Sequence, residues 1–93
     1  MRIRWHRLAR RDLRDVRAYI ARDNPKAAAR IAQRIRTSIE RLADNPSLGR
    51  PGRVLDTREF MVTGTPCLVP YTVSDNEIVI LRVLHGAQQW PQR

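Results

Sequence analysis

The sequence is short of the residues that build disulfide-rich, zinc-binding and membrane-spanning proteins. Its 93 residues include one cysteine, Cys67, and two histidines, His6 and His85. One cysteine cannot form an internal disulfide, which is typical of a reducing compartment, and the spacing of a zinc site is absent. No apolar run approaches the roughly 20 residues of a membrane helix, and the first residues lack the apolar stretch of a secretory signal. We therefore expect a cytoplasmic protein with no metal, no cofactor and no membrane partner.

Lysine is almost absent as well, yet the chain is strongly basic, because 17 of its 18 basic residues are arginine. The net charge of +9 is unevenly placed: residues 1–53 hold 15 of the basic groups and five of the nine acidic ones. The arginine guanidinium binds phosphate and carboxylate groups through paired hydrogen bonds. The charge favours a nucleic acid, the ribosome or an acidic protein segment as partner. The alternative is that the arginines only keep the outer faces of two helices solvated, which would give the same number of basic residues.

Two amphipathic helices are predicted in the first half of the chain. Apolar residues recur at helical spacing in residues 8–22, with arginines on the opposite side. Asn24 and Pro25 are a typical N-cap and first-turn pair, and the second helix is expected to run to about Ala43, before Asn45-Pro46. The expected buried positions are Ala9, Leu13, Val16, Ile20, Ala28, Ile31, Ile35, Ile39 and Leu42, and the outward ones are Arg7, Arg10, Arg14, Arg17, Arg30, Arg34, Thr37 and Arg41.

The remaining residues are strand-forming segments separated by turn signals. Residues 78–81 are apolar on both faces, which indicates a central strand with helices on one side and another cover on the other. Pro70 cannot donate to a sheet ladder, so an unpaired or bulged position is expected beside it. The chain is thus predicted to be one α+β domain, residues 1–93, with two antiparallel helices packed on a small, mostly antiparallel sheet. The expected strands are 3–5, 53–55, 57–62, 67–73 and 77–84, the last two joined by a turn at 74–76.

Several motifs together resemble one known family. They are Asn24-Pro25, Asn45-Pro46, the glycine- and proline-rich loop at 49–53, residues 65–73 and, as the strongest piece, residues 80–88. The chain resembles the RelE/ParE toxins of bacterial type II toxin–antitoxin pairs, also called plasmid stabilisation proteins. The resemblance implies a cognate antitoxin protein that forms a hetero-oligomer with the toxin. Some members of this family cut mRNA on the ribosome, and members of the ParE branch inhibit DNA gyrase by binding it.

Cleavage of RNA would require a proton-transfer group and cations at the reacting phosphate. The resemblance offers His85 as acid or base, with Arg58 and Arg82 as phosphate contacts. Glu59 is a more distant possible base. Each candidate also has a structural alternative. His85 would shape the turn after the last strand, and Arg82 or Arg58 would form a network with Glu59, because an uncompensated cation in an apolar strand is costly.

Two departures from the nuclease members favour the gyrase branch. In those members an arginine in a matching strand and a tyrosine near the C-terminus take part in cleavage. Here Cys67 stands at the first position, where it is expected to be a small buried residue, and Gly86 or Ala87 stands at the second. We therefore predict a ParE-like gyrase inhibitor. An mRNA endonuclease is the alternative, and a member that only binds its partner is a third reading.

Contacts with the target or the antitoxin are predicted in two regions. Asp12 and Asp15 offset the arginines of the first helix only in part. These arginines are expected to face acidic residues of the antitoxin, which would lay an amphipathic helix or an extended segment across an apolar groove. The C-terminal stretch is the second region, because tryptophan is enriched in interfaces and toxicity in the ParE branch is associated with the chain end. Trp90 would alternatively pack back over the sheet. The predicted contact residues are Arg10, Arg14, Arg17, Arg82, His85, Gln88 and Trp90.

Overall fold

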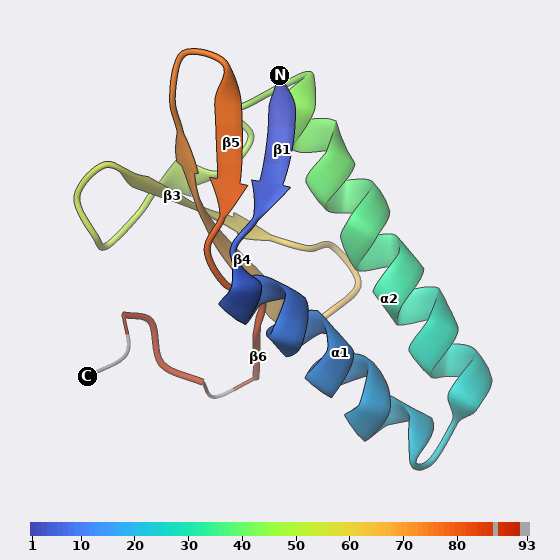
Figure 1. Ribbon diagram of the computed structural model, residues 1–93. Helices are drawn as coiled ribbons and strands as arrows, with labels where there is room; N and C mark the ends of the chain where they lie inside the picture. Colours follow the sequence, from blue (N-terminus) through green and yellow to red (C-terminus); the bar gives the residue numbers. More distant parts are fainter. Residues whose placement is uncertain (87, 92–93) are drawn as a thin grey trace.

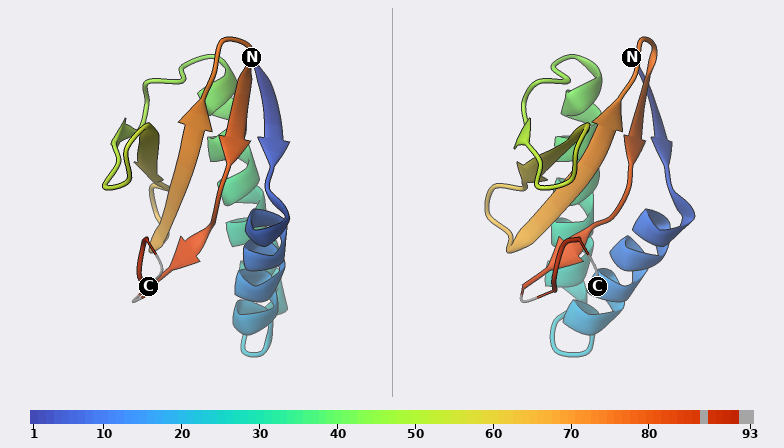
Figure 2. Two further views of the ribbon diagram at one scale, coloured as in Figure 1. Left: turned by 60° about the vertical axis from the view of Figure 1, so that its left-hand side comes forward. Right: turned by 90° about the vertical axis from the view of Figure 1, so that its left-hand side faces the viewer.

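Two helices pack on one face of a sheet in the computed structural model, which describes residues 1–86 and 88–91 (Figure 1). Figure 2 shows both helices on the same side of the strands. This is the predicted architecture, an antiparallel helix pair on a mostly antiparallel sheet. In chain order the elements are β1 (Arg2–Trp5), α1 (Arg7–Ala21), α2 (Pro25–Glu40), the short 3₁₀ helix η1 (Arg41–Ala43), β2 (Arg50–Pro51), β3 (Thr57–Met61), β4 (Cys67–Val73), β5 (Glu77–Ile80) and β6 (Leu84–His85).

The strands follow the order β1-β5-β4-β3-β2, and β6 pairs with β4 beyond the end of β5. In the described part of the chain β1 and β5 form the one parallel pair. β5 is therefore an internal strand, as its apolar sequence predicts. Ile78 and Ile80 are fully buried beneath the helices, and Val79 is half-buried on the other face.

The helix boundaries follow from local capping. His6 precedes α1, and its Nδ1 accepts a hydrogen bond from the backbone N–H of Leu8 at 3.0 Å. Asn24 caps α2 as predicted, with its Oδ1 3.1 Å from the backbone nitrogen of Ala27 and Pro25 in the first turn. In the described part of the chain, no helix has both the length and the apolar character that a bilayer span requires.

The core lies between the helix pair and the sheet. The predicted helix positions are buried, with Ile20 and Ile31 half-buried, and Ala32 is a further buried residue of α2. They meet apolar side chains of β4 and β5. Asp12 differs from the prediction: it faces inward and is 9% exposed.

The strand predicted at 53–55 is wrong. The chain pairs earlier, at β2, and then turns: the Gly52 N–H donates to the Thr57 carbonyl at 2.8 Å, and the Thr57 N–H donates to the Val54 carbonyl at 3.1 Å. Asp56 has a φ of 63°, which belongs to a turn and not to a strand. These bonds leave residues 53–56 as a tight loop before β3.

The strand predicted at 77–84 is also wrong as a continuous element, because it is interrupted opposite Pro70. Tyr71 pairs with Ile80, and Leu68 pairs with Leu84. Two residues of β4 therefore oppose three residues, 81–83, which is a bulge. Pro70 has no N–H to donate toward residues 81–83, although its carbonyl accepts a hydrogen bond from the Leu81 N–H at 2.9 Å. The bulged position expected beside Pro70 is confirmed.

Candidate functional site

Arg82 lies in the bulge, and its side chain reaches the helix layer. Its guanidinium donates two hydrogen bonds to Asp12, from Nε to Oδ2 at 2.7 Å and from Nη2 to Oδ1 at 3.0 Å. The backbone N–H of Val83 donates to the same Oδ2 at 3.0 Å. The two side chains are only 12% and 10% exposed. The hydrogen-bonded carboxylate raises the pKa of Arg82, because it favours the charged guanidinium.

The predicted pair between Arg82 and Glu59 is therefore wrong, as is the expectation that Asp12 offsets the surface arginines. Side chains alternate between the two faces of a strand. The hydrogen bonds to Asp12 of α1 place Arg82 on the helix side, where Ile80 also lies, whereas Glu59 is paired with Pro70 on the opposite face. Asp12 is thus the counter-ion of a structural cation that ties α1 to the sheet.

Glu59 is a second buried charge, on the face of the sheet that carries no helix. Its Oε2 accepts from the Arg53 backbone N–H at 2.8 Å. Its Oε1 lies 3.5 Å from Arg50 Nη2 and 3.6 Å from Arg53 Nε, and within the described residues it has no hydrogen bond. The carboxylate is fully buried, while both arginine side chains are more than half exposed. Glu59 therefore holds the 49–53 loop against β3.

Arg58 holds the same loop from the helix face. Its Nη1 donates to the Gly49 carbonyl at 2.6 Å. The Tyr71 hydroxyl accepts from the Gly49 N–H at 2.8 Å and donates to the Pro46 carbonyl at 2.7 Å. Burial raises the pKa of Tyr71, and the Gly49 hydrogen bond and the Arg58 charge oppose that rise. The bond to Gly49 uses one of the five N–H donors of the Arg58 guanidinium and fixes its position beside the loop.

His85 lies at the end of β6, on the same side as α1. Its ring centroid is 6.1 Å from that of Tyr19, with the two planes tilted by 54°. Its backbone N–H donates to Gln88 Oε1 at 2.7 Å, and the next residue, Gly86, donates to the Pro66 carbonyl at 3.1 Å. These bonds favour the structural alternative, in which His85 shapes the turn after the last strand.

The three residues predicted for cleavage do not converge. Arg58 is paired with Tyr71 and His85 with Cys67, at opposite parts of β4. Four residues of strand separate these positions, which is about 13 Å at the usual rise. Arg82 is engaged by a carboxylate on the helix side. The separation of Arg58 from His85 argues against one reacting phosphate shared by all three side chains.

Cys67 is the buried residue that the sequence predicts, with no exposed surface. Burial raises the pKa of its thiol, with a smaller opposing effect of the hydrogen bond to Thr65. A thiol of this kind is a poor nucleophile. Among the described residues, no group of three histidine, cysteine, aspartate or glutamate side chains is placed to hold a metal ion.

The described C-terminal residues fold back on the 49–53 loop. The Trp90 carbonyl accepts from Arg53 Nη1 at 3.1 Å. The Trp90 indole nitrogen is buried, with no hydrogen-bond partner in the described part of the chain. This arrangement favours the packing alternative for Trp90, and Gln88 serves the turn at His85. Ala87, at the position of the expected aromatic hydroxyl, lies outside the described residues.

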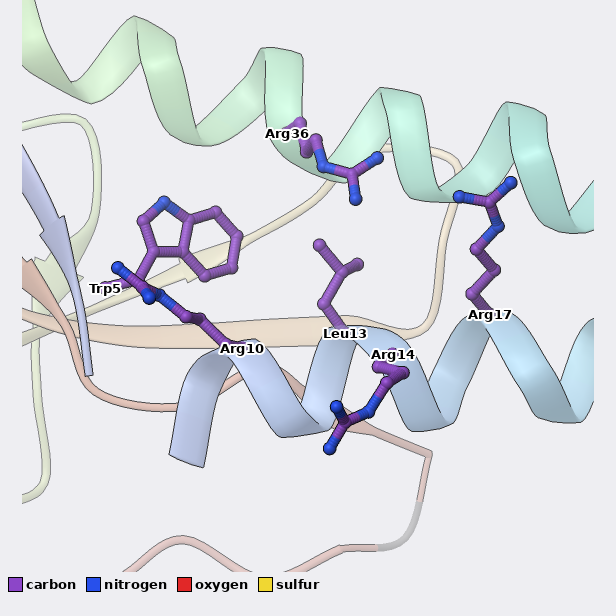
Figure 3. A pocket seen from close by; sticks show the side chains of 6 residues that line it. All are labelled: Trp5, Arg10, Leu13, Arg14, Arg17 and Arg36. Atoms are coloured by element: carbon purple, nitrogen blue, oxygen red, sulfur yellow. The ribbon is translucent and has the colours of Figure 1, made fainter. Parts of the chain in front are cut away.

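The first-helix arginines line a cavity of about 420 Å³ between β1, α1 and α2 (Figure 3). Trp5 and Leu13 supply its apolar surface, and Figure 3 shows Arg17 extending from α1 toward α2, while Arg36 lies along α2. Arg10, Arg14 and Arg17 all line this cavity, and their contact with a target or an antitoxin stays a prediction. Trp5, Leu13 and Arg36 were not predicted as site residues, because only packing places the end of β1 beside α2. The signal available in the sequence was an aromatic residue directly before a basic helix.

Comparisons with known proteins agree on one family. Residues 3–90 match the family described as ParE toxin of type II toxin–antitoxin system, parDE. The protein Y4kP of Sinorhizobium fredii is 47% identical over 91 residues, covering 98% of this chain and 94% of Y4kP. A structure of the chromosomal ParDE system from P. aeruginosa is similar with a TM-score of 0.81 and 30% identity, over 91% of this chain and 95% of that one. The RelBE2 toxin–antitoxin complex from Mycobacterium tuberculosis is similar with a TM-score of 0.64 and 27% identity, over 91% and 96%.

Proposed function

This chain belongs to the ParE toxin family of type II toxin–antitoxin systems, and from that premise we propose that it inhibits DNA gyrase by binding and is neutralised by a cognate antitoxin. The family assignment agrees with the resemblance of its motifs. The proposal concerns the target and the mode of action.

One observation carries the choice of a binding mechanism. Arg82, the cation nearest to His85 in sequence, is held by Asp12 through two hydrogen bonds in a buried setting. Phosphoryl transfer needs preorganised positive charge at the reacting phosphate, and a guanidinium neutralised by a carboxylate supplies little. The separation of Arg58 from His85 along β4 and the burial of Cys67 support the same choice.

The similarity to solved structures favours the ParE branch as well. The TM-score to the ParDE structure is 0.81, against 0.64 to the RelBE2 structure. Both of these neighbours are toxin–antitoxin systems, which supports an antitoxin as the resident partner of this chain. An antitoxin that folds on binding would leave the free toxin active once it is degraded.

A supercoiling assay tests the proposal. Free toxin would be added to purified gyrase, relaxed plasmid and ATP, with the toxin–antitoxin complex as the matched control. We expect the free toxin to block supercoiling and the complex to leave it unchanged. Full supercoiling at a large molar excess of folded toxin would refute gyrase as the target.

The alternative is a ribosome-dependent mRNA endonuclease, which the likeness to RelBE2 favours. It is tested by cell-free translation from ready-made mRNA, followed by primer extension on that mRNA. Cuts that appear with the wild-type toxin and vanish with His85→Gln and Arg58→Ala would establish the nuclease and overturn the binding mechanism. Intact mRNA with undisturbed translation would refute the nuclease, and the supercoiling assay would then separate a gyrase inhibitor from a member that only binds its partner.

A further inference from the structure

A further cavity, of about 570 Å³, lies on the flank of α2 that faces away from α1, and we call it the α2 groove. The polar residues that line it are Arg30, Gln33, Arg34, Thr37, Ser38 and Arg41. Arg34 and Arg36 are two residues apart and therefore point roughly 160° apart around the helix. The α2 groove and the cavity beside Arg36 are thus separate surfaces on different sides of α2.

The polar side chains of the α2 groove carry hydrogen-bond donors and no carboxylate. Three of them are guanidinium groups, and the others are hydroxyl and amide groups. Among residues 1–86 and 88–91, no carboxylate forms an ion pair with any of these three arginines. Glu40, the one acidic residue of α2, does not line the groove. The groove is therefore an uncompensated positive surface that is complementary to an anion.

Arg34 is positioned by the turn between β3 and β4, which passes beside α2 (Figure 1). Its Nη1 donates a long hydrogen bond to the Thr63 carbonyl at 3.4 Å. Gly64 has a φ of 79°, and a Cβ at this position would lie 2.5 Å from the same Nη1. The missing side chain at Gly64 therefore lets the turn contact the guanidinium directly. The contact uses one of the five N–H donors of Arg34 and leaves the other four for a ligand.

The α2 groove lacks the apolar centre that is typical of a protein interface. Ile31, which is half-buried, is the one apolar side chain that lines it. Large exposed apolar side chains such as Tyr19, Leu48 and Met61 lie outside it. Interfaces with DNA are more polar and much more positive than interfaces between proteins. The composition of the groove therefore favours a nucleic acid over an acidic protein segment.

The groove also lacks aromatic side chains. The aromatic residues of the chain are Trp5, Tyr19, Phe60, Tyr71 and Trp90, and none of them lines it. Proteins that bind single-stranded nucleic acids combine positive charge with aromatic side chains on which the bases stack. A duplex keeps its bases stacked inside and presents its phosphates, so charge alone is enough to hold it. The lack of aromatic residues favours a duplex.

We propose that the α2 groove binds the phosphate backbone of duplex DNA, with Arg30, Arg34 and Arg41 as the phosphate contacts. Arg30 and Arg41 lie about three helical turns apart, or about 16 Å along the axis, and one DNA strand carries a charge about every 3.4 Å. The groove therefore has room for three separate phosphate contacts. Thr37 and Ser38 add the neutral hydroxyl donors that backbone contacts often use. That the duplex is DNA, held by gyrase in the cell, rests on the proposed function.

The salt dependence of binding tests the site. Fluorescence anisotropy would follow free toxin binding to a labelled DNA duplex of about 20 base pairs between about 50 and 200 mM salt. The test variant is Arg30→Gln/Arg34→Gln/Arg41→Gln, and its control is Arg7→Gln/Arg11→Gln/Arg22→Gln. The control loses the same charge at exposed positions outside the groove. Glutamine is a good helix former, so both variants should keep the fold, which circular dichroism would check.

Each phosphate contact contributes about 0.9 to the slope of log K against log salt, so the test variant should lose about 2.7 of that slope and the control less than about 1. Over this fourfold range of salt, a change of about 2.7 alters the salt dependence of the affinity by a factor of about 40. The smaller change Arg34→Gln should lower the slope by about 0.9. Equal slopes for the two triple variants would mean that net charge alone attracts DNA, and would overturn the site. No binding of the wild-type toxin at about 50 mM salt would also overturn it.

Unlabelled competitors establish the kind of ligand. We expect duplex DNA to displace the probe at least about tenfold better than single-stranded DNA of the same length or polyglutamate of matched charge. Polyglutamate as effective as the duplex would reassign the groove to an acidic protein and overturn the proposal. A single strand or an RNA duplex that competed better than duplex DNA would overturn it as well.

The supercoiling assay separates this site from the proposed function. If the groove holds the DNA on which gyrase acts, the test variant should inhibit supercoiling less than the control variant does at the same concentration. DNA binding through the groove with intact supercoiling would refute the proposed function alone. Gyrase inhibition by the wild-type toxin, with equal salt slopes in the two triple variants, would refute this site alone.

Discussion

Replacing Asp12 by asparagine tests the buried ion pair that joins α1 to the end of the sheet. The carboxylate accepts three hydrogen bonds, two from Arg82 and one from the Val83 N–H, at 2.7–3.0 Å. Asparagine keeps the shape and one acceptor oxygen but leaves Arg82 without its counter-ion. Removing one partner of a fully buried pair costs about 3–5 kcal/mol. Because these side chains retain 12% and 10% exposure, we expect the lower end, about 3 kcal/mol.

A loss of this size is easy to measure in a small domain. The free energy of unfolding of such domains is about 5–15 kcal/mol, and about 1 kcal/mol shifts the melting temperature of a domain of this size by about 4–8 °C. Asp12→Asn should therefore melt at least about 12 °C below wild type. Urea unfolding of the free toxin, followed by circular dichroism, should show a lower midpoint with an unchanged slope.

Two further variants make the result specific. Asp15→Asn removes the same charge from the exposed side of α1 and should change stability by less than about 0.5 kcal/mol. The double variant Asp12→Leu/Arg82→Met removes both charges together and should recover part of the loss, because apolar side chains of similar volume replace buried pairs well. The recovery is incomplete because the buried Val83 N–H loses its acceptor. An Asp12→Asn protein no less stable than Asp15→Asn would refute the structural role of this pair.

Three other measurements probe the loop and the core. Since burial raises the pKa of Tyr71, its contribution to stability should be complete below the unfolded pKa of about 10 and should fall as the pH rises above it. Tyr71→Phe should reduce the loss of stability at alkaline pH, and the remainder belongs in part to Cys67, whose pKa burial also raises. Tyr19→Phe, at an exposed position, should keep the full alkaline loss, and equal pH profiles of the two variants would contradict the assignment. The Cys67 thiol is buried with a raised pKa, so iodoacetamide should modify it only after unfolding, and rapid labelling of the folded toxin in mass spectra would show that the site is open. Gly49→Ala places a methyl group 2.7 Å from the Tyr71 ring and hydroxyl and should cost about 1–3 kcal/mol in urea unfolding, which an unchanged midpoint would disprove.

The sequence by itself determined the elements whose signals are local. The start of α2 follows from Asn24 and Pro25, whereas α2 ends at Glu40 and residues 41–43, predicted as its last turn, form the 3₁₀ helix η1. Both helices keep the predicted buried face, because helical periodicity depends on residues within a turn or two. β4 has the predicted bounds. Pro70 correctly indicated a bulge, because a residue without an N–H interrupts the hydrogen-bond ladder whichever strand lies beside it. The family motifs in turn predicted the toxin fold that the structural neighbours share.

Only the tertiary structure decided which charges meet. Asp12 and Arg82 are 70 positions apart in sequence, and Glu59 was the nearer acid to predict. The strand register places Glu59 on the opposite face from Arg82, so a pair that seemed natural in sequence cannot form. The site at β1 is non-local for the same reason: Trp5, Leu13 and Arg36 become neighbours when β1 and the helices pack around one core. The face on which a side chain lies, and the register of its strand, are set by pairing between segments that are distant in sequence. The energy of that pairing is distributed over the whole fold, so no short segment of sequence determines it.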